Sequence, residues 1–166
     1  MTRARRHREG EEGFSLLEAV LVLVLMAIVL AAAFGGPSLI ANRRLAGAAR
    51  DLGGELRWVE QRARAERRCW RVVFDPAGEL YHIHFLAGGS WTASGGCTGG
   101  TWTAYTASGP RALARSIDLF STTFGSDTMT VSPFGNPNGG TVVLQSPNGE
   151  QRRVIVNVLG RVLITR

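Results

Sequence analysis

Hydrophobic positions follow two different patterns in the N-terminal third of the chain. Every residue from Ala19 to Phe34 is apolar, and a helix over residues 14–36 is long enough to span the roughly 30 Å hydrocarbon core of a bilayer. Pro37 then removes one helical hydrogen bond, so we expect the helix to be interrupted there. Residues 14–36 are therefore predicted to form a transmembrane helix.

A second pattern occupies residues 37–68. Apolar side chains recur there at steps of three and four, which predicts an amphipathic helix with one core-facing stripe. The stripe consists of Leu45, Ala49, Leu52, Leu56, Val59 and Ala63. Charged residues fill the other faces of this helix, so Glu60 is expected in solvent together with Arg57 and Arg64.

From Cys69 onward the pattern changes to short apolar or alternating runs separated by turn residues. The 21 glycines and their spacing suit short antiparallel strands joined by tight turns. Strands are expected over residues 70–74, 80–86, 101–106, 115–124, 129–132, 141–146, 152–157 and 161–165, with a loop over 87–100. The predicted class is α+β: a long N-terminal helix, transmembrane in its first half, packed on an antiparallel β-sheet head over residues 69–166.

Glu18 is an acidic residue at the start of the apolar segment. At a bilayer centre a carboxylate costs roughly 2.5–3.5 kcal/mol, so it needs a partner. An arginine-rich leader, residues 1–13, ends in Gly13 directly before Phe14. If the chain is cut after Gly13, the new α-amino group of Phe14 lies about one helical turn from Glu18. That amine can neutralise the carboxylate within the chain or in a neighbouring copy.

This arrangement resembles the processing site of type IV prepilins and pseudopilins, with Gly13 at the cut, aromatic Phe14 after it and Glu18 close behind. The resemblance implies that a prepilin peptidase cleaves after Gly13 and methylates the amino group of Phe14. It also implies that Glu18 recruits and registers the subunit in a growing filament, whose core contains the helix over 14–36. The alternative is a plain single-pass signal anchor that carries one Glu. A cleavable secretory signal would instead be cut after its apolar region.

The C-terminal half adds a second resemblance. The runs 134–144, 154–157 and 160–162, together with 56–73, are similar to the GspH/FimT group of minor pseudopilins. The resemblance implies a minor pilin or pseudopilin of a type II secretion pseudopilus or a type IV pilus. Its expected partners are prepilin peptidase, other pilin or pseudopilin subunits, an inner-membrane assembly platform and, before assembly, the lipid bilayer. The implied location is the inner membrane, crossed once, with the head on the periplasmic side.

The chain is basic, with a net charge of +6, and contains no lysine. Such a charge is compatible with an anionic partner such as DNA or lipid headgroups. Four arginines fall on the last two predicted strands and can share an edge or face if these strands pair antiparallel: Arg152, Arg153, Arg161 and Arg166. Gly160-Arg161 resembles the start of a basic region in FimT-type minor pilins linked to DNA capture, although Leu163 stands where a second arginine would strengthen the match. DNA binding by a competence-type minor pilin is the alternative function, and a solvated strand face is the plainer interpretation.

The chain has two cysteines, Cys69 and Cys97. Behind a membrane anchor they would face an oxidising compartment, which favours a disulfide between them. Such a bridge would contribute about 3–4 kcal/mol by the loop-entropy model. Two free thiols, one of them buried, remain the alternative.

Candidate catalytic and metal-binding groups are sparse. His82 and His84 stand two apart on one predicted strand, a spacing that can bind metal, but no third ligand is near them in sequence. The absence of lysine excludes a P-loop lysine and a lysine Schiff base. The chain also lacks a Gly-x-Ser-x-Gly elbow and a paired-carboxylate signature. We therefore expect no enzymatic activity, no metal site and no cofactor.

Overall fold

The computed structural model describes residues 15–92, 96–105, 109–114 and 116–166, apart from the side chains of residues 32–38. The chain divides into two compact units, Met1–Pro37 and Ser38–Arg166, which we describe separately. The helix α1 (Leu16–Glu66) contributes to both units.

In the first unit, α1 begins directly after Ser15. The Ser15 carbonyl accepts hydrogen bonds from the amides of Glu18 (2.9 Å) and Ala19 (3.1 Å), and its hydroxyl accepts one from the Leu17 amide at 3.2 Å. Ser15 therefore supplies the side-chain cap that helix N-termini favour. Among the described residues, no helix combines the length and the hydropathy needed to cross a membrane.

The structure assigns helix without a break from Leu16 to Glu66, so Pro37 does not end the helix, and a kink at Pro37 stays a prediction. A proline removes only one hydrogen bond from the helical ladder, so a helix can continue past it. The boundary between the two compact units nevertheless falls directly after Pro37.

In the second unit, the predicted apolar stripe of α1 is confirmed. Its members Leu45, Ala49, Leu52, Leu56, Val59 and Ala63 are all buried. They pack in one hydrophobic cluster with inward-facing residues of two antiparallel sheets. Trp70, which is fully buried, sits in this cluster with its ring 5.7 Å from that of Trp58.

The first sheet has the strand order β5-β2-β1-β8, and β6 also pairs with β2. Its strands are β1 (Trp70–Asp75), β2 (Leu80–Ala87), β5 (Thr101–Ala104), β6 (Arg111–Ala112) and β8 (Thr128–Val131). Along β2, Tyr81 and Ile83 are buried and alternate with partly exposed neighbours, as expected for a half-buried strand. The 3₁₀ turn η1 (Gly125–Asp127) directly precedes β8.

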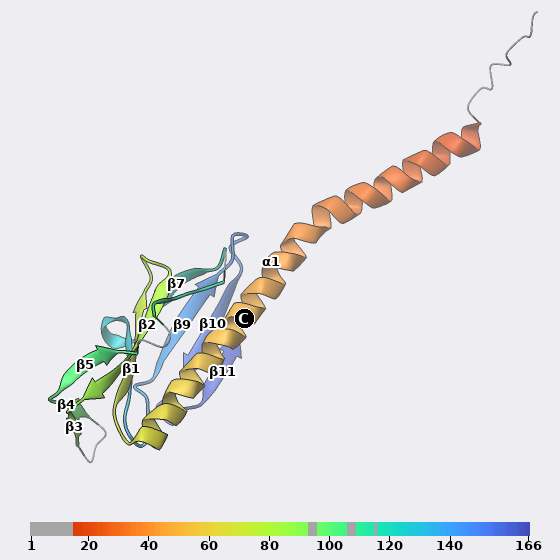
Figure 1. Ribbon diagram of the computed structural model, residues 1–166. Coiled ribbons are helices and arrows are strands. Elements are labelled where there is room, and N and C mark those ends of the chain that lie inside the picture. The colour runs from red at the N-terminus through yellow and green to blue at the C-terminus, as the bar shows by residue number, and fades with distance from the viewer. Residues whose placement is uncertain (1–14, 93–95, 106–108, 115) are drawn as a thin grey trace, which may run out of the picture. The chain divides into compact units, whose positions relative to one another are not determined.

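The second sheet has the order β11-β10-β9-β7. Its strands are β7 (Asp118–Thr122), β9 (Gly140–Gln145), β10 (Gln151–Val156) and β11 (Val162–Thr165). Figure 1 shows the second part of α1 running alongside β10 and β11. Two contacts fix this approach: Arg57 Nη2 donates to the Val162 carbonyl at 2.9 Å, and Gly53 leaves room for Ile164.

The fold confirms the α+β class with an antiparallel head, while several strand boundaries differ from expectation. The segment 87–100 was expected to be a loop, but its described part contains the two-residue strands β3 (Ser90–Trp91) and β4 (Cys97–Thr98), which pair with each other. The strand expected over 115–124 is confined to β7, and β6 was not predicted at all. Strands of two residues are too short to give an alternating pattern, which explains why they were missed.

Candidate functional site

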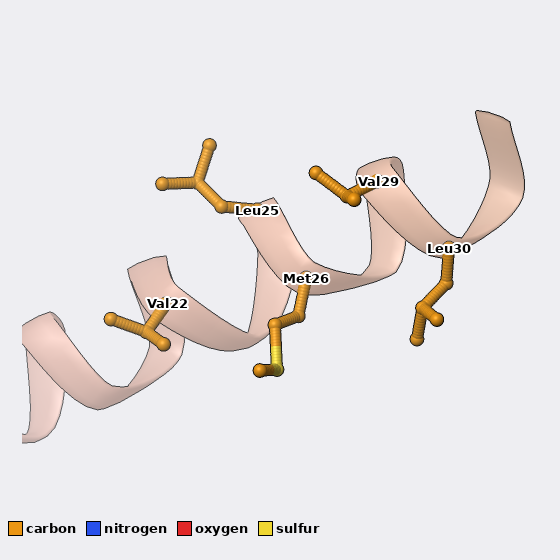
Figure 2. Close-up of a pocket in the computed structure, with 5 residues that line it drawn as sticks. All are labelled: Val22, Leu25, Met26, Val29 and Leu30. Atoms are coloured by element: carbon orange, nitrogen blue, oxygen red, sulfur yellow. The ribbon is translucent and has the colours of Figure 1, made fainter. Parts of the chain in front are cut away.

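The first part of α1 carries an exposed apolar surface. Its large apolar side chains are exposed, with Leu16 at 84%. Five of them line one shallow hollow at the helical spacing i, i+3, i+4, i+7 and i+8 (Figure 2): Val22, Leu25, Met26, Val29 and Leu30. Residues at this spacing form one face of a helix, so this face can pack against another helix or against lipid acyl chains.

Glu18 lies in the first turn of the same helix, and its side chain is exposed. An acidic group at this position interacts favourably with the partial positive charge at the helix N-terminus. The predicted processing residues Gly13 and Phe14 lie outside the described residues, so cleavage, methylation and the pairing with Glu18 stay predictions.

Glu60 is the largest departure of the head from the sequence-based expectation. The sequence pattern predicted Glu60 on the solvated face of α1, but in the structure Glu60 is only 5% exposed. Its Oε2 lies 2.9 Å from the position that a Cβ on Gly160 would take, and within the described residues its Oε1 has no hydrogen-bond partner. Burial raises the pKa of Glu60 to about 7, an effect that the nearby Arg64 and Arg57 reduce. The carboxyl group is therefore held close to its titration point at neutral pH.

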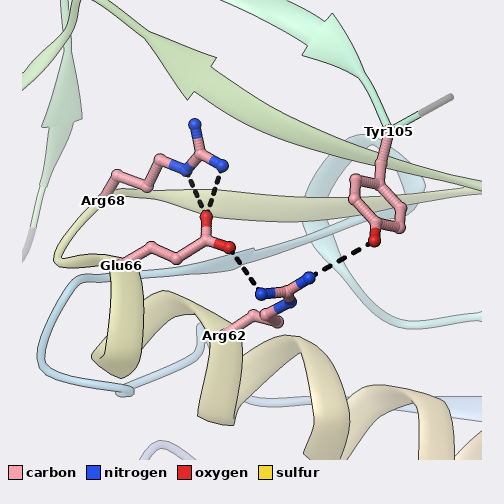
Figure 3. A network of polar contacts seen from close by, with 4 residues as sticks. All are labelled: Arg62, Glu66, Arg68 and Tyr105. Carbon is pink, nitrogen blue, oxygen red and sulfur yellow. Dashed lines mark hydrogen bonds and ion pairs between the residues drawn. The ribbon is translucent and has the colours of Figure 1, made fainter. Parts of the chain in front are cut away.

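The C-terminal end of α1 is attached to the first sheet by a polar network (Figure 3). Arg62 bridges Glu66 (Nη1 to Oε1, 2.9 Å) and donates to the Tyr105 hydroxyl at 3.4 Å, while Arg68 forms a second ion pair with Glu66. The Arg68 guanidinium also lies 4.0 Å above the Phe85 ring. Glu66 is thus shared between two arginines, so this end of the helix is fixed by charge as well as by packing.

Cys69 and Cys97 are joined by a disulfide with a Cα–Cα distance of 6.0 Å. Cys69 is buried between the end of α1 and the start of β1, whereas Cys97 begins β4. The bridge therefore attaches the β3–β4 hairpin to the core of the head.

The structure distributes the four arginines proposed for DNA binding over both faces of the second sheet. Arg153 pairs with Thr165 across β10 and β11, and the adjacent Arg152 points to the opposite face of the sheet because side chains alternate along a strand. Arg161 lies beyond the other end of β11, next to Asn157. By the same register and alternation, Arg153 and Arg161 lie on one exposed face of the sheet, at opposite ends of β10, and Arg166, directly after Thr165, follows the alternation of Arg152. DNA binding through these arginines stays a prediction.

His82 and His84 lie on β2 with their ring centroids 6.2 Å apart. Burial lowers the pKa of His84, and the neighbouring Arg71 and His82 lower it further. Among the described residues, no group of three or more His, Cys, Asp or Glu side chains is arranged to hold a metal ion.

The geometry thus combines an unpartnered apolar helix with a head of two antiparallel sheets packed on the continuation of that helix. This is the architecture of the pilin-like class. The sequence of residues 48–160 matches the family model of the type II transport protein GspH. The chain therefore belongs to the GspH family, whose members are structural pilin-like subunits and not enzymes.

Two solved structures are similar to this chain. The minor pseudopilin EpsH from the type 2 secretion system of Vibrio cholerae is 16% identical, with 74% of this chain and 96% of that chain covered at a TM-score of 0.56. The type IV minor pilin FimU of Pseudomonas aeruginosa is 19% identical, with 75% and 90% covered at a TM-score of 0.49. Comparison by sequence with curated proteins gives no significant match.

Proposed function

We propose that this chain is a minor subunit of the pseudopilus of a type II transport system. A prepilin peptidase cleaves it after Gly13 and methylates Phe14. Before assembly the apolar first part of α1 resides in the inner membrane, crossed once, with the head on the periplasmic side. An inner-membrane assembly platform then transfers it into the filament.

The observation that carries the proposal is the exposed apolar face of α1, together with the acidic Glu18 at its beginning. Burying this face against the helices of neighbouring subunits would remove large apolar side chains from water. This burial would stabilise the assembly by roughly 25 cal/mol for each Å² of apolar surface. A carboxylate inside such a bundle has to be neutralised, since an unpaired buried charge is costly. The α-amino group of Phe14, in the same chain or the next, is the partner we assign to Glu18.

Membership of the GspH family supports the type II machine over a type IV pilus. The name of EpsH, a minor pseudopilin of a type 2 secretion system, is consistent with this choice. The family match and the name of EpsH do not favour the DNA-binding alternative.

The role of Glu18 can be tested by incorporation into filaments. Full-length chains carrying Glu18→Gln or Glu12→Gln are expressed in cells that contain the cognate machinery. Both changes remove one negative charge, but Glu12 belongs to the leader that cleavage discards. We expect Glu18→Gln to lower recovery in the sheared filament fraction at least tenfold and Glu12→Gln to leave it unchanged. Equal recovery of both variants would support the plain signal anchor instead.

A further inference from the structure

The head contains three tight turns of one geometry but of different chemistry. In each turn the amide of a glycine donates to the carbonyl of the residue three positions before it, and the glycine has φ between +78° and +79°. The turns are Ser132–Gly135, Ser146–Gly149 and Asn157–Gly160. Their third positions hold Phe134, Asn148 and Leu159. A type I turn followed by a left-handed glycine accepts most residues at this position, so the geometry does not require an apolar one.

The two apolar turns lie together and display their apolar side chains to solvent. The Gly135 carbonyl lies 3.2 Å from where a Cβ on Gly160 would be. Phe134, Val158 and Leu159 are 55%, 61% and 71% exposed. Turns normally carry polar residues, and the polar Ser146–Gly149 turn stands at the opposite end of β10. We call the surface formed by Phe134, Val158 and Leu159 the turn face.

Hydrogen bonds hold both apolar turns rigidly in this position. The Asn157 side chain accepts from the amides of Leu159 (3.0 Å) and Arg161 (2.8 Å). The Ser132 hydroxyl accepts from the Asn136 amide at 3.3 Å, and Arg64 donates to the Gly135 carbonyl at 3.2 Å. The chain thus fixes apolar groups in water, which lowers the entropy cost of binding a partner through them.

The charges around the turn face identify the kind of partner. Arg64 and Arg161 are exposed beside it, and the segments 132–139 and 157–161 contain no acidic residue. Two carboxylates in this part of α1 are unavailable, because Glu60 is buried beneath the turns and Glu66 is paired with two arginines. Two copies of the turn face would bring like charges together, so self-association through it is disfavoured.

We propose that the turn face is a docking surface for a different pilin-like subunit, whose contact region is apolar at its centre and acidic at its rim. This inference rests on the proposed function, because it takes the partner from the same filament. Phe134 and Leu159 are the apolar anchors, and Arg161 provides charge selection at the edge. An apolar centre with a polar or charged rim is the usual composition of a protein interface.

The test is photo-crosslinking in cells that assemble the filament. The full-length chain carries p-benzoylphenylalanine in place of Phe134 or, as the matched control, in place of Asn148, which has the same position in the polar turn. We expect at least tenfold more adduct from position 134, with a second pilin-like chain of different sequence, and acidic residues in its crosslinked peptide. Comparable yields at the two positions, no adduct at either, or an adduct of two identical chains would overturn the proposal.

Two further variants test charge and folding. Arg161→Glu should lower the adduct at least threefold, whereas Arg153→Glu, the same change farther along β10, should leave it unchanged. With the crosslinker at position 134, Leu159→Asn copies the polar turn and should lose the adduct while keeping the melting temperature, since the Leu159 side chain is exposed. Filament incorporation is measured in the same cells. These outcomes refer to the chain that carries the crosslinker at position 134 and no other change. If it enters the filament without forming an adduct, the docking surface is refuted and the filament role stands. If it forms the adduct without entering the filament, the filament role alone is refuted, and if it does neither, both are refuted.

Discussion

The buried carboxylate of Glu60 should make the stability of the head depend on pH. In the unfolded chain its pKa is near 4.5, and in the folded head burial raises the pKa to about 7. Below pH 4.5 the group is protonated in both states and costs nothing. Between pH 4.5 and 7 the unfolded chain releases this proton while the folded head retains it, so the unfolding free energy decreases with rising pH and levels off above 7. At about 1.4 kcal/mol for each pH unit between the two values, the total loss is about 3 kcal/mol.

Glu60→Gln isolates this effect, because glutamine has nearly the same shape and no charge to bury. We expect the variant to match the unmodified head at pH 4.5 and to be more stable by about 3 kcal/mol at pH 8. All residues of the hydrophobic core lie in the unit Ser38–Arg166, so urea unfolding of that segment, followed by tryptophan fluorescence, is a suitable assay. Each protein gives a profile of unfolding free energy against pH. Subtracting one profile from the other removes the pH dependence that His84 contributes to both. A difference that stays constant within about 1 kcal/mol from pH 4.5 to 8 would refute the reasoning.

Two other predictions concern the packing of the head. Replacing Cys69 and Cys97 together by Ser should lower the unfolding free energy by about 3.5 kcal/mol, the loop-entropy value for their separation of 28 residues; an unchanged urea midpoint would show that the bridge does not constrain the unfolded chain. Gly53→Leu should destabilise by about 1–3 kcal/mol, because the built Cβ already lies 3.4 Å from Ile164. The matched variant Gly54→Leu, which meets nothing within 4 Å, should instead stabilise the helix by about 0.5–1 kcal/mol; similar effects of both variants in thermal unfolding would contradict the packing of β11 on α1.

The helix and most strands of this fold follow from short-range patterns in the sequence. Leu45 and Leu56 belong to a stripe whose period is that of an α-helix, and burial of that stripe needs no knowledge of the partner sheets. The strands of the second sheet are bounded by turn residues such as Asn148 and Gly149, whose backbone preferences are local. Cys69 and Cys97 were paired as the only two cysteines, not by any pattern.

The features that the sequence did not predict depend on contacts between distant segments. Glu60 borders the apolar stripe, one residue after Val59, but only the loops around Gly135 and Gly160 bury it. The face on which each arginine of β10 lies follows from alternation, while its distance from Arg161 requires the register with β11. The turn face likewise arises because two loops from different parts of the chain meet.

The central claim is that this chain is processed and assembled as a pilin-like subunit. The most direct test is intact-mass analysis of the membrane-extracted protein, produced together with its native prepilin peptidase. We expect a product that begins at Phe14 and carries one added methyl group. A chain that retains residues 1–13, while the same peptidase cleaves a control substrate, would contradict it and favour the plain signal anchor.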